Sequence, residues 1–174
     1  MLGSADDRFT KNVKRGSDPI IRPATPADVP LILQLIRELA EYEKLSHEVR
    51  ATEALLRATL FVPQPAAEVV IAEHDGEAVG FAVFFASYST WEAAPGLYLE
   101  DLFVRPEARG KGIGRELLEY LANLTMTRGW ARLEWRVLDW NEPSIAFYKK
   151  LGAEPLDDWT VFRVTGAALK KLAG

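Results

Sequence analysis

Two adjacent carboxylates, Glu100 and Asp101, interrupt an apolar segment that otherwise has the character of a central β-strand, Leu97–Val104. In a regular strand, neighbouring side chains point to opposite faces, so each carboxylate would enter an apolar region. Burying an ionised carboxylate without a partner is costly, and such positions therefore mark an opening, a bulge or a functional site. A strand end with two solvated acids is the alternative. The apolar residues Leu102–Val104 continue beyond the pair and favour a functional role.

A glycine-rich turn, RGKGIG at residues 109–114, follows this segment and precedes a helical pattern. Its glycines let a ligand approach the backbone, and Arg109 and Lys111 add cationic donors. The start of the next helix offers N–H groups and a partial positive charge, so the pattern predicts a phosphate-binding turn. The turn lacks the GxxxxGK[ST] pattern of a P-loop, and residues 105–109 separate the strand from the glycines, which disfavours a Rossmann turn. An NAD(P) enzyme and an ordinary flexible turn are the weaker alternatives.

Asn141, Ser144 and Tyr148 have the i, i+3, i+7 spacing of one helix stripe, in a helical pattern that ends at Gly152. This stripe presents an amide, a hydroxyl and a phenol, which suits recognition of a polar ligand. A helix cap followed by a half-buried tyrosine explains the same residues without a ligand. The combination with the glycine turn favours the ligand-binding interpretation.

The composition excludes several classes of protein. The 174 residues are 48% hydrophobic and 26% charged, which is typical of a globular protein with its own core. Cysteine is absent, which excludes disulfide scaffolds, thiol catalysis and thiolate metal sites. With only two histidines, His47 and His74, we expect no bound metal. The net charge of −4 disfavours nucleic-acid binding.

The ends of the chain carry no targeting signal in this interpretation. No stretch approaches the ~18 consecutive apolar residues of a membrane span, and residues 1–17 lack the apolar centre of a secretory signal. We therefore expect a cytoplasmic protein with no membrane partner. We also expect residues 1–17 to form a polar N-terminal extension and residues 18–174 to form a single domain.

The apolar periodicity predicts elements in the order β-α-α-β-β-β-α-β-α-β-α. Thr25 and Pro26 mark a helix start, Asp75-Gly76 a hairpin turn and Gly129 a helix stop. An antiparallel meander followed by β-α-β-α-β predicts the α/β class, a mixed sheet with helices on both faces. The expected strands cover residues 19–22, 68–74, 77–88, 97–104, 131–138 and 159–164.

The strand with the paired carboxylates, the glycine turn and the polar helix stripe together resemble the acetyl-CoA-binding signature of the GNAT acetyltransferase superfamily. Their sequences are LYLEDLFV at 97–104, RPEARGKGIGRELL at 105–118 and WNEPSIAFYKKLGA at 140–153. The resemblance covers roughly Ile20–Ala173. IRPAT at 21–25 and IRELAEYE at 36–43 are similar to the diamine (spermidine/spermine) branch, which includes thialysine acetyltransferases. The resemblance implies the GNAT fold, a mostly antiparallel sheet flanked by helices on both faces.

The resemblance also implies an acetyl-CoA-dependent N-acetyltransferase, with acetyl-CoA as co-substrate and a small-molecule primary amine as acceptor. Tyr148 would be the general acid, and Glu43, Glu100 and Asp101 match acidic positions near the acceptor amine. A homodimer is implied in the same way, with C-terminal segments crossing between subunits. The cofactor-binding residues expected on this basis are Leu102, Phe103, Val104, Arg109, Gly110, Lys111, Gly112, Ile113, Gly114, Arg115, Asn141, Ser144 and Tyr148.

The chemistry of acetyl transfer assigns a task to each group. A protonated alkylamine has a pKa of ~10.4 and must lose its proton before it attacks a thioester. We expect Glu100 to take that proton, directly or through a water, while Asp101 or Glu43 attracts the ammonium group. Tyr148 would protonate the departing thiolate, in direct transfer without a covalent enzyme intermediate. A non-catalytic acyl-CoA-binding regulatory module and an acetyltransferase of protein amines are the alternatives.

Overall fold

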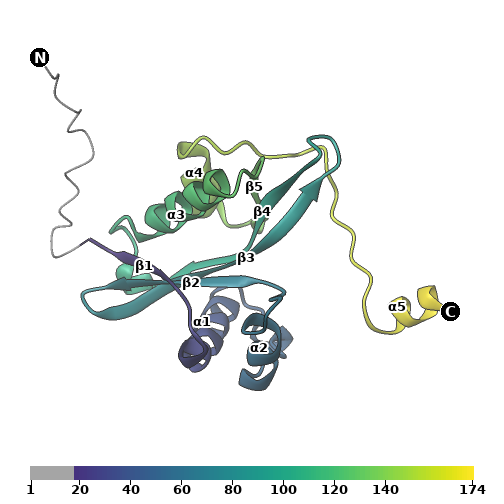
Figure 1. Ribbon diagram of the computed structural model, residues 1–174, viewed down its shortest axis with the longest axis horizontal. Helices are drawn as coiled ribbons and strands as arrows, with labels where there is room; N and C mark the ends of the chain where they lie inside the picture. The colour runs from purple at the N-terminus through teal and green to yellow at the C-terminus, as the bar shows by residue number, and fades with distance from the viewer. Residues whose placement is uncertain (1–17) are drawn as a thin grey trace, which may run out of the picture. The chain divides into compact units, whose positions relative to one another are not determined.

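A computed structural model describes residues 18–174 (Figure 1). The expected polar extension, residues 1–17, lies outside the described residues. The chain divides into two compact units, Met1–Arg136 and Val137–Gly174, and each unit is considered by itself. The single domain over residues 18–174 stays a prediction. Within the described part of the chain, no helix has the length and apolar character needed to cross a membrane.

The first unit contains a mixed five-stranded sheet in the order β1-β2-β3-β4-β5. The first four strands form an antiparallel meander, and β5 lies parallel to β4. The predicted hairpin turn is confirmed, because Asp75 and Gly76 both have positive φ, at 53° and 81°. The strands are β1 (Ile20–Pro23), β2 (Glu68–His74), β3 (Glu77–Ser89), β4 (Ala94–Val104) and β5 (Leu133–Trp135).

Helices cover both faces of this sheet, as predicted. Helices α1 (Val29–Tyr42) and α2 (Glu53–Leu60) lie on one face and α3 (Ile113–Thr127) on the other (Figure 1). The apolar stripe of α1 buries Ile32 and Leu35, and these side chains form a core cluster with sheet residues that share one face: Val69, Ile71, Phe81 and Phe103. The apolar side chains of α3 are buried at helical spacing, and the residues are Ile113, Leu117, Leu118 and Leu121.

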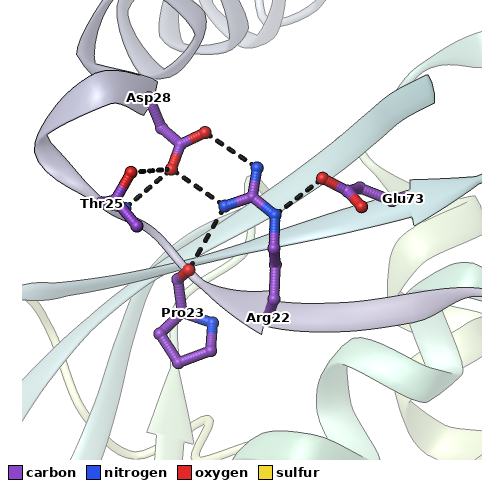
Figure 2. A network of polar contacts seen from close by, with 5 residues as sticks. All are labelled: Arg22, Pro23, Thr25, Asp28 and Glu73. Carbon is purple, nitrogen blue, oxygen red and sulfur yellow. Dashed lines mark hydrogen bonds and ion pairs between the residues drawn. The ribbon is translucent and has the colours of Figure 1, made fainter. Parts of the chain in front are cut away.

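A polar network fastens the start of α1 to the sheet (Figure 2). Arg22 on β1 donates from Nε to Glu73 on β2, at 2.7 Å, and from both terminal nitrogens to the carboxylate of Asp28, at 2.9 and 2.8 Å. Asp28 also accepts from the backbone N–H and the hydroxyl of Thr25. The hydrogen bonds from Arg22 hold the pKa of Asp28 well below its usual range. This ionic network therefore links β1, β2 and the turn before α1.

The second unit contains two helices, α4 (Glu142–Lys150) and α5 (Gly166–Ala173). The predicted strand over residues 159–164 is wrong, because this segment has no regular structure. Its apolar side chains are exposed, 69% for Trp159 and 89% for Phe162. A strand needs a neighbouring strand for its backbone N–H and C=O groups, and residues 137–174 contain none. The predicted strand over 131–138 is shorter in the structure than expected, because only Leu133–Trp135 pairs with β4.

Candidate active site

A β-bulge at Glu100 shapes the centre of β4. The ladder between β3 and β4 pairs Val83 with Asp101 and Phe84 with Leu99, so Glu100 has no partner opposite it. The expectation that Glu100 and Asp101 point to opposite faces assumed a regular strand, and the strand is irregular at this position. The extra residue reverses the alternation of side chains along the strand. Leu99 therefore faces α3, while Asp101, opposite Val83, lies on the face that α1 covers.

Three predicted acidic residues lie close enough at the bulge to influence one another. Burial raises the pKa of Asp101 to about 6, and repulsion from Glu100 and Glu43 adds to the shift. Glu43 follows directly after α1, and burial raises its pKa as well. Glu100 itself is exposed. This arrangement concentrates negative charge beside an exposed carboxylate and attracts a cationic group. Among residues 18–174, no set of three or more histidine, cysteine or carboxylate side chains could hold a metal ion.

The outer edge of β4 is open beyond the bulge. Strand β5 pairs only with Leu97–Leu99. The backbone N–H of Arg105 donates to the carbonyl oxygen of Val79 on β3, at 2.8 Å. Because N–H directions alternate along an antiparallel ladder, the N–H of Phe103 also points to β3, and those of Leu102 and Val104 point to the opposite edge. Of these three expected cofactor-binding residues, two therefore direct backbone groups outward, while the side chain of Phe103 is in the core.

Two glycines of the predicted phosphate-binding turn have a backbone conformation that favours glycine. Gly110 and Gly112 have φ of 78° and 83°, a region that disfavours other residues. No heavy atom lies within 4 Å of the position that a Cβ would take at either glycine, so the space in front of the turn is open. Gly112 caps α3, whose first N–H groups have no intrahelical partners. These groups fit a diphosphate. Lys111 is exposed beside them, and Arg115 pairs with Glu119 at 2.7 Å.

Arg109 does not extend freely from this turn. Its guanidinium carbon lies 4.5 Å from the ring centre of Tyr42 and 5.8 Å from that of Phe103. Its Nε donates to the carbonyl of Val104, at 2.9 Å. The sequence analysis missed Tyr42. Its position directly before Glu43, at the end of a helix with an otherwise clear apolar stripe, was the available signal.

The remaining predicted residues lie in the second unit. Asn141 precedes α4, and its side-chain oxygen accepts from the N–H of Ser144, at 3.4 Å. This is the helix cap that the alternative interpretation anticipated. The ring of Tyr148 lies 5.4 Å from that of Phe147. The structure thus assembles the acidic cluster, the open edge and the glycine turn in the first unit, and it places Asn141, Ser144 and Tyr148 together around α4.

Comparisons with known proteins agree with this geometry. The model of the acetyltransferase (GNAT) family matches residues 32–153, which include the bulge, the turn and α4. A thialysine N-epsilon-acetyltransferase from Bos taurus is 42% identical over 89% of this chain and 97% of its own length. An L-ornithine N5-acetyltransferase from Arabidopsis thaliana is 32% identical over 87% of this chain and 86% of its own.

A solved structure has a similar fold. An integron cassette protein from V. cholerae superposes with a TM-score of 0.75 at 28% identity, over 89% of this chain and 97% of the other. The family match covers more than half of the chain, and the relatives extend over nearly all of it. This chain therefore belongs to the acetyltransferase (GNAT) family, whose members use acetyl-CoA, and is an N-acetyltransferase of small-molecule amines.

Proposed function

We propose that this enzyme moves the acetyl group of acetyl-CoA to the terminal amine of a small aliphatic amino acid, with thialysine and ornithine as the reference substrates. The observation that carries the proposal is the partly buried carboxylate of Asp101, which lies near Glu43 and Glu100 where β4 opens. Such a cluster favours an ammonium group over a neutral acceptor. Two relatives with names that specify terminal-amine acetylation of amino acids support the same acceptor class.

Acetyl-CoA supplies the acyl group as a thioester, and the chain offers backbone groups to hold it. The outward N–H groups of Leu102 and Val104 lie on the open edge of β4 and suit the acyl end of the molecule. There they also supply donors for the negative charge that develops on the carbonyl oxygen. The turn from Gly110 to Arg115 suits the diphosphate. Asn141 and Ser144 provide further polar contacts.

Two proton transfers complete the proposed mechanism. Asp101 and Glu43 attract the ammonium form of the acceptor. Glu100 removes its proton through a water molecule, because its side chain is exposed. The hydroxyl of Tyr148 donates a proton to the departing thiolate, whose thiol has an ordinary pKa of ~8.5. The chain has no cysteine for an acyl-enzyme, and direct transfer accounts for the reaction with the residues named.

An amine panel tests the acceptor class. The enzyme is mixed with acetyl-CoA and thialysine, ornithine, lysine or spermidine, and the release of free CoA is followed. We expect kcat/KM to be highest for thialysine or ornithine, with acetylation at the terminal nitrogen confirmed by mass spectrometry. A higher value for spermidine would contradict the amino-acid assignment in favour of a polyamine acceptor. Absence of turnover with every amine would contradict the proposed acceptor class.

The role of Glu100 has its own test. Glu100→Gln removes the proton acceptor and leaves the cofactor-binding backbone in place. We expect acetyl-CoA binding, measured by calorimetry, to stay unchanged while amine acetylation falls. Asp101→Asn is the matched comparison, because it alters the neighbouring carboxylate and is expected to raise KM for the amine. Weakened acetyl-CoA binding with normal acetylation in Glu100→Gln would contradict the assignment.

We also propose that the enzyme is a homodimer. Support comes from the segment after α4, where apolar side chains are exposed at Leu156, Trp159, Val161 and Phe162. Apolar residues at this density are typical of surfaces that another chain covers. Light scattering coupled to size-exclusion chromatography should give the mass of two chains, and Phe162→Ser should shift the mass toward that of one chain. A monomeric wild-type protein would contradict the proposal.

A further inference from the structure

Two arginines attach the stem of the glycine turn to helix α1. Arg105 begins the stem, and its Nε and one terminal nitrogen donate to the carboxylate of Glu38, at 2.8 and 2.9 Å. Its other terminal nitrogen donates to the carbonyl of Ala78 on β3, at 2.9 Å. A paired, planar contact of this kind fixes orientation as well as distance. The hydrogen bonds with Arg105 lower the pKa of Glu38, which keeps that carboxylate ionised.

The second attachment is made by Arg109, after the short 3-10 turn Pro106–Ala108. Its guanidinium stacks on Tyr42, at 4.5 Å, while its Nε holds the carbonyl of Val104. Glu38 and Tyr42 are four residues apart on α1 and therefore share one helix face. Arg105 and Arg109 are also four residues apart. We call the two contacts, Arg105 with Glu38 and Arg109 with Tyr42, the arginine clasp.

The arginine clasp acts on the backbone that the proposed function assigns to the diphosphate. Gly110 follows Arg109 directly, and glycines in the left-handed region give the turn many alternative conformations when it is free. Ordering such a turn on ligand binding costs affinity, and a turn held in its binding conformation avoids that cost. The clasp fixes the residue immediately before the glycines, so it keeps their N–H groups in a preorganised arrangement.

We propose that Tyr42 is a positioning residue for the diphosphate of acetyl-CoA and acts through Arg109, although it lies on the helix that ends at the acceptor-binding Glu43. This inference rests on the proposed function, which assigns the diphosphate to the turn. It predicts that loss of the Tyr42 ring weakens binding of ligands that carry the diphosphate and leaves binding of ligands without it unchanged.

The test compares CoA with pantetheine, which contains the thiol arm but no diphosphate. Both dissociation constants are measured by calorimetry for the wild-type enzyme and for Tyr42→Leu. We expect Tyr42→Leu to weaken CoA binding by about threefold to tenfold, the range for loss of one cation–π contact, and to leave pantetheine binding unchanged. Tyr42→Phe retains the ring and should bind CoA as the wild type does. Tyr88→Leu, at an exposed aromatic position on β3, is the matched control.

A second variant covers the case in which Tyr42→Leu fails to fold. Glu38→Gln removes the charge that pairs with Arg105 and should weaken CoA binding selectively in the same way. If a folded variant bound CoA and pantetheine more weakly by the same factor, or bound both as the wild type does, the inference would be overturned. The proposed function would stay intact. If the wild-type enzyme bound CoA no more tightly than pantetheine, the diphosphate site itself would be wrong and the inference would fail with it.

Discussion

Replacement of Asp101 by asparagine should stabilise the enzyme at neutral pH. The pKa of Asp101 is raised from 3.8 to about 6 in the folded chain, first by burial and then by Glu100 and Glu43. The folded state thus binds this proton more tightly than the unfolded state does. Stability that is fully present below pH 4 is lost as the pH rises through 6. The shift corresponds to at most about 3 kcal/mol, since one pKa unit is worth ~1.4 kcal/mol.

Urea unfolding at a series of pH values between 4 and 7.5 measures this effect. The free energy of unfolding of the wild type should fall relative to that of Asp101→Asn as the pH rises, with most of the change between pH 4 and 6. Asp157→Asn, at an exposed position in the second unit, should show no such difference. The same pH dependence in wild type and Asp101→Asn would refute the argument, because it would mean that Asp101 titrates alike in the folded and unfolded chains.

Three further substitutions test other parts of the structure. Arg22→Met leaves Asp28 and Glu73 without their cation and should cost about 2 kcal/mol in urea unfolding at pH 7. Because the pKa of Asp28 is lowered, this difference from the wild type should shrink as the pH falls below 3.8; an undiminished difference in acid would contradict the ionic explanation. Gly112→Ala places a side chain at φ of 83°, which costs ~1–2 kcal/mol, and should weaken CoA binding measured by calorimetry; unchanged affinity would argue against the turn as the diphosphate site. Tyr148→Phe should lower kcat by about 10²-fold in the CoA-release assay, and full turnover would remove Tyr148 from the acid role.

The glycine turn shows what sequence reasoning predicts well. A requirement for positive φ is a local property, and glycine is the residue that meets it without strain. The sequence singled out the glycines at 110, 112 and 114 because they remove side chains, and the structure adds that Gly110 and Gly112 have positive φ. The meander and the helices on both faces follow in the same way from periodicity, because an apolar stripe has to be buried against a neighbouring element.

The bulge at Glu100 shows where that reasoning fails. Alternation with a period of two assigns faces correctly only when every residue has a partner, and one unpaired residue exchanges the faces of everything after it. The clasp was not predictable for a related reason. It joins Glu38 and Arg105, which are 67 positions apart. Nothing in the sequence distinguishes these two charged residues from others that are exposed to solvent.

Residues 159–164 show a third limit. Their composition favours a strand, since aromatic and β-branched residues dominate the segment. Propensity describes how well a residue fits a pleated surface, and it does not supply the adjacent strand that completes the hydrogen bonds. The second unit offers no such neighbour, so the preference of the sequence has no structural effect within it.

Glu100 is an extra residue in β4, so substitution and deletion at this position have different consequences. Replacing Glu100 with any other residue keeps the count between Leu99 and Asp101 and leaves the later N–H groups directed outward. Deleting it would place Leu99 directly before Asp101, opposite the neighbouring residues Phe84 and Val83, so the regular ladder would be restored and both side chains would keep their faces. The N–H groups of Leu102 and Val104 would still point away from β3, while the Glu100 carboxylate and the local bend of the strand would be lost. Removal of one residue, which reverses the faces of a regular strand, would therefore preserve them in this one.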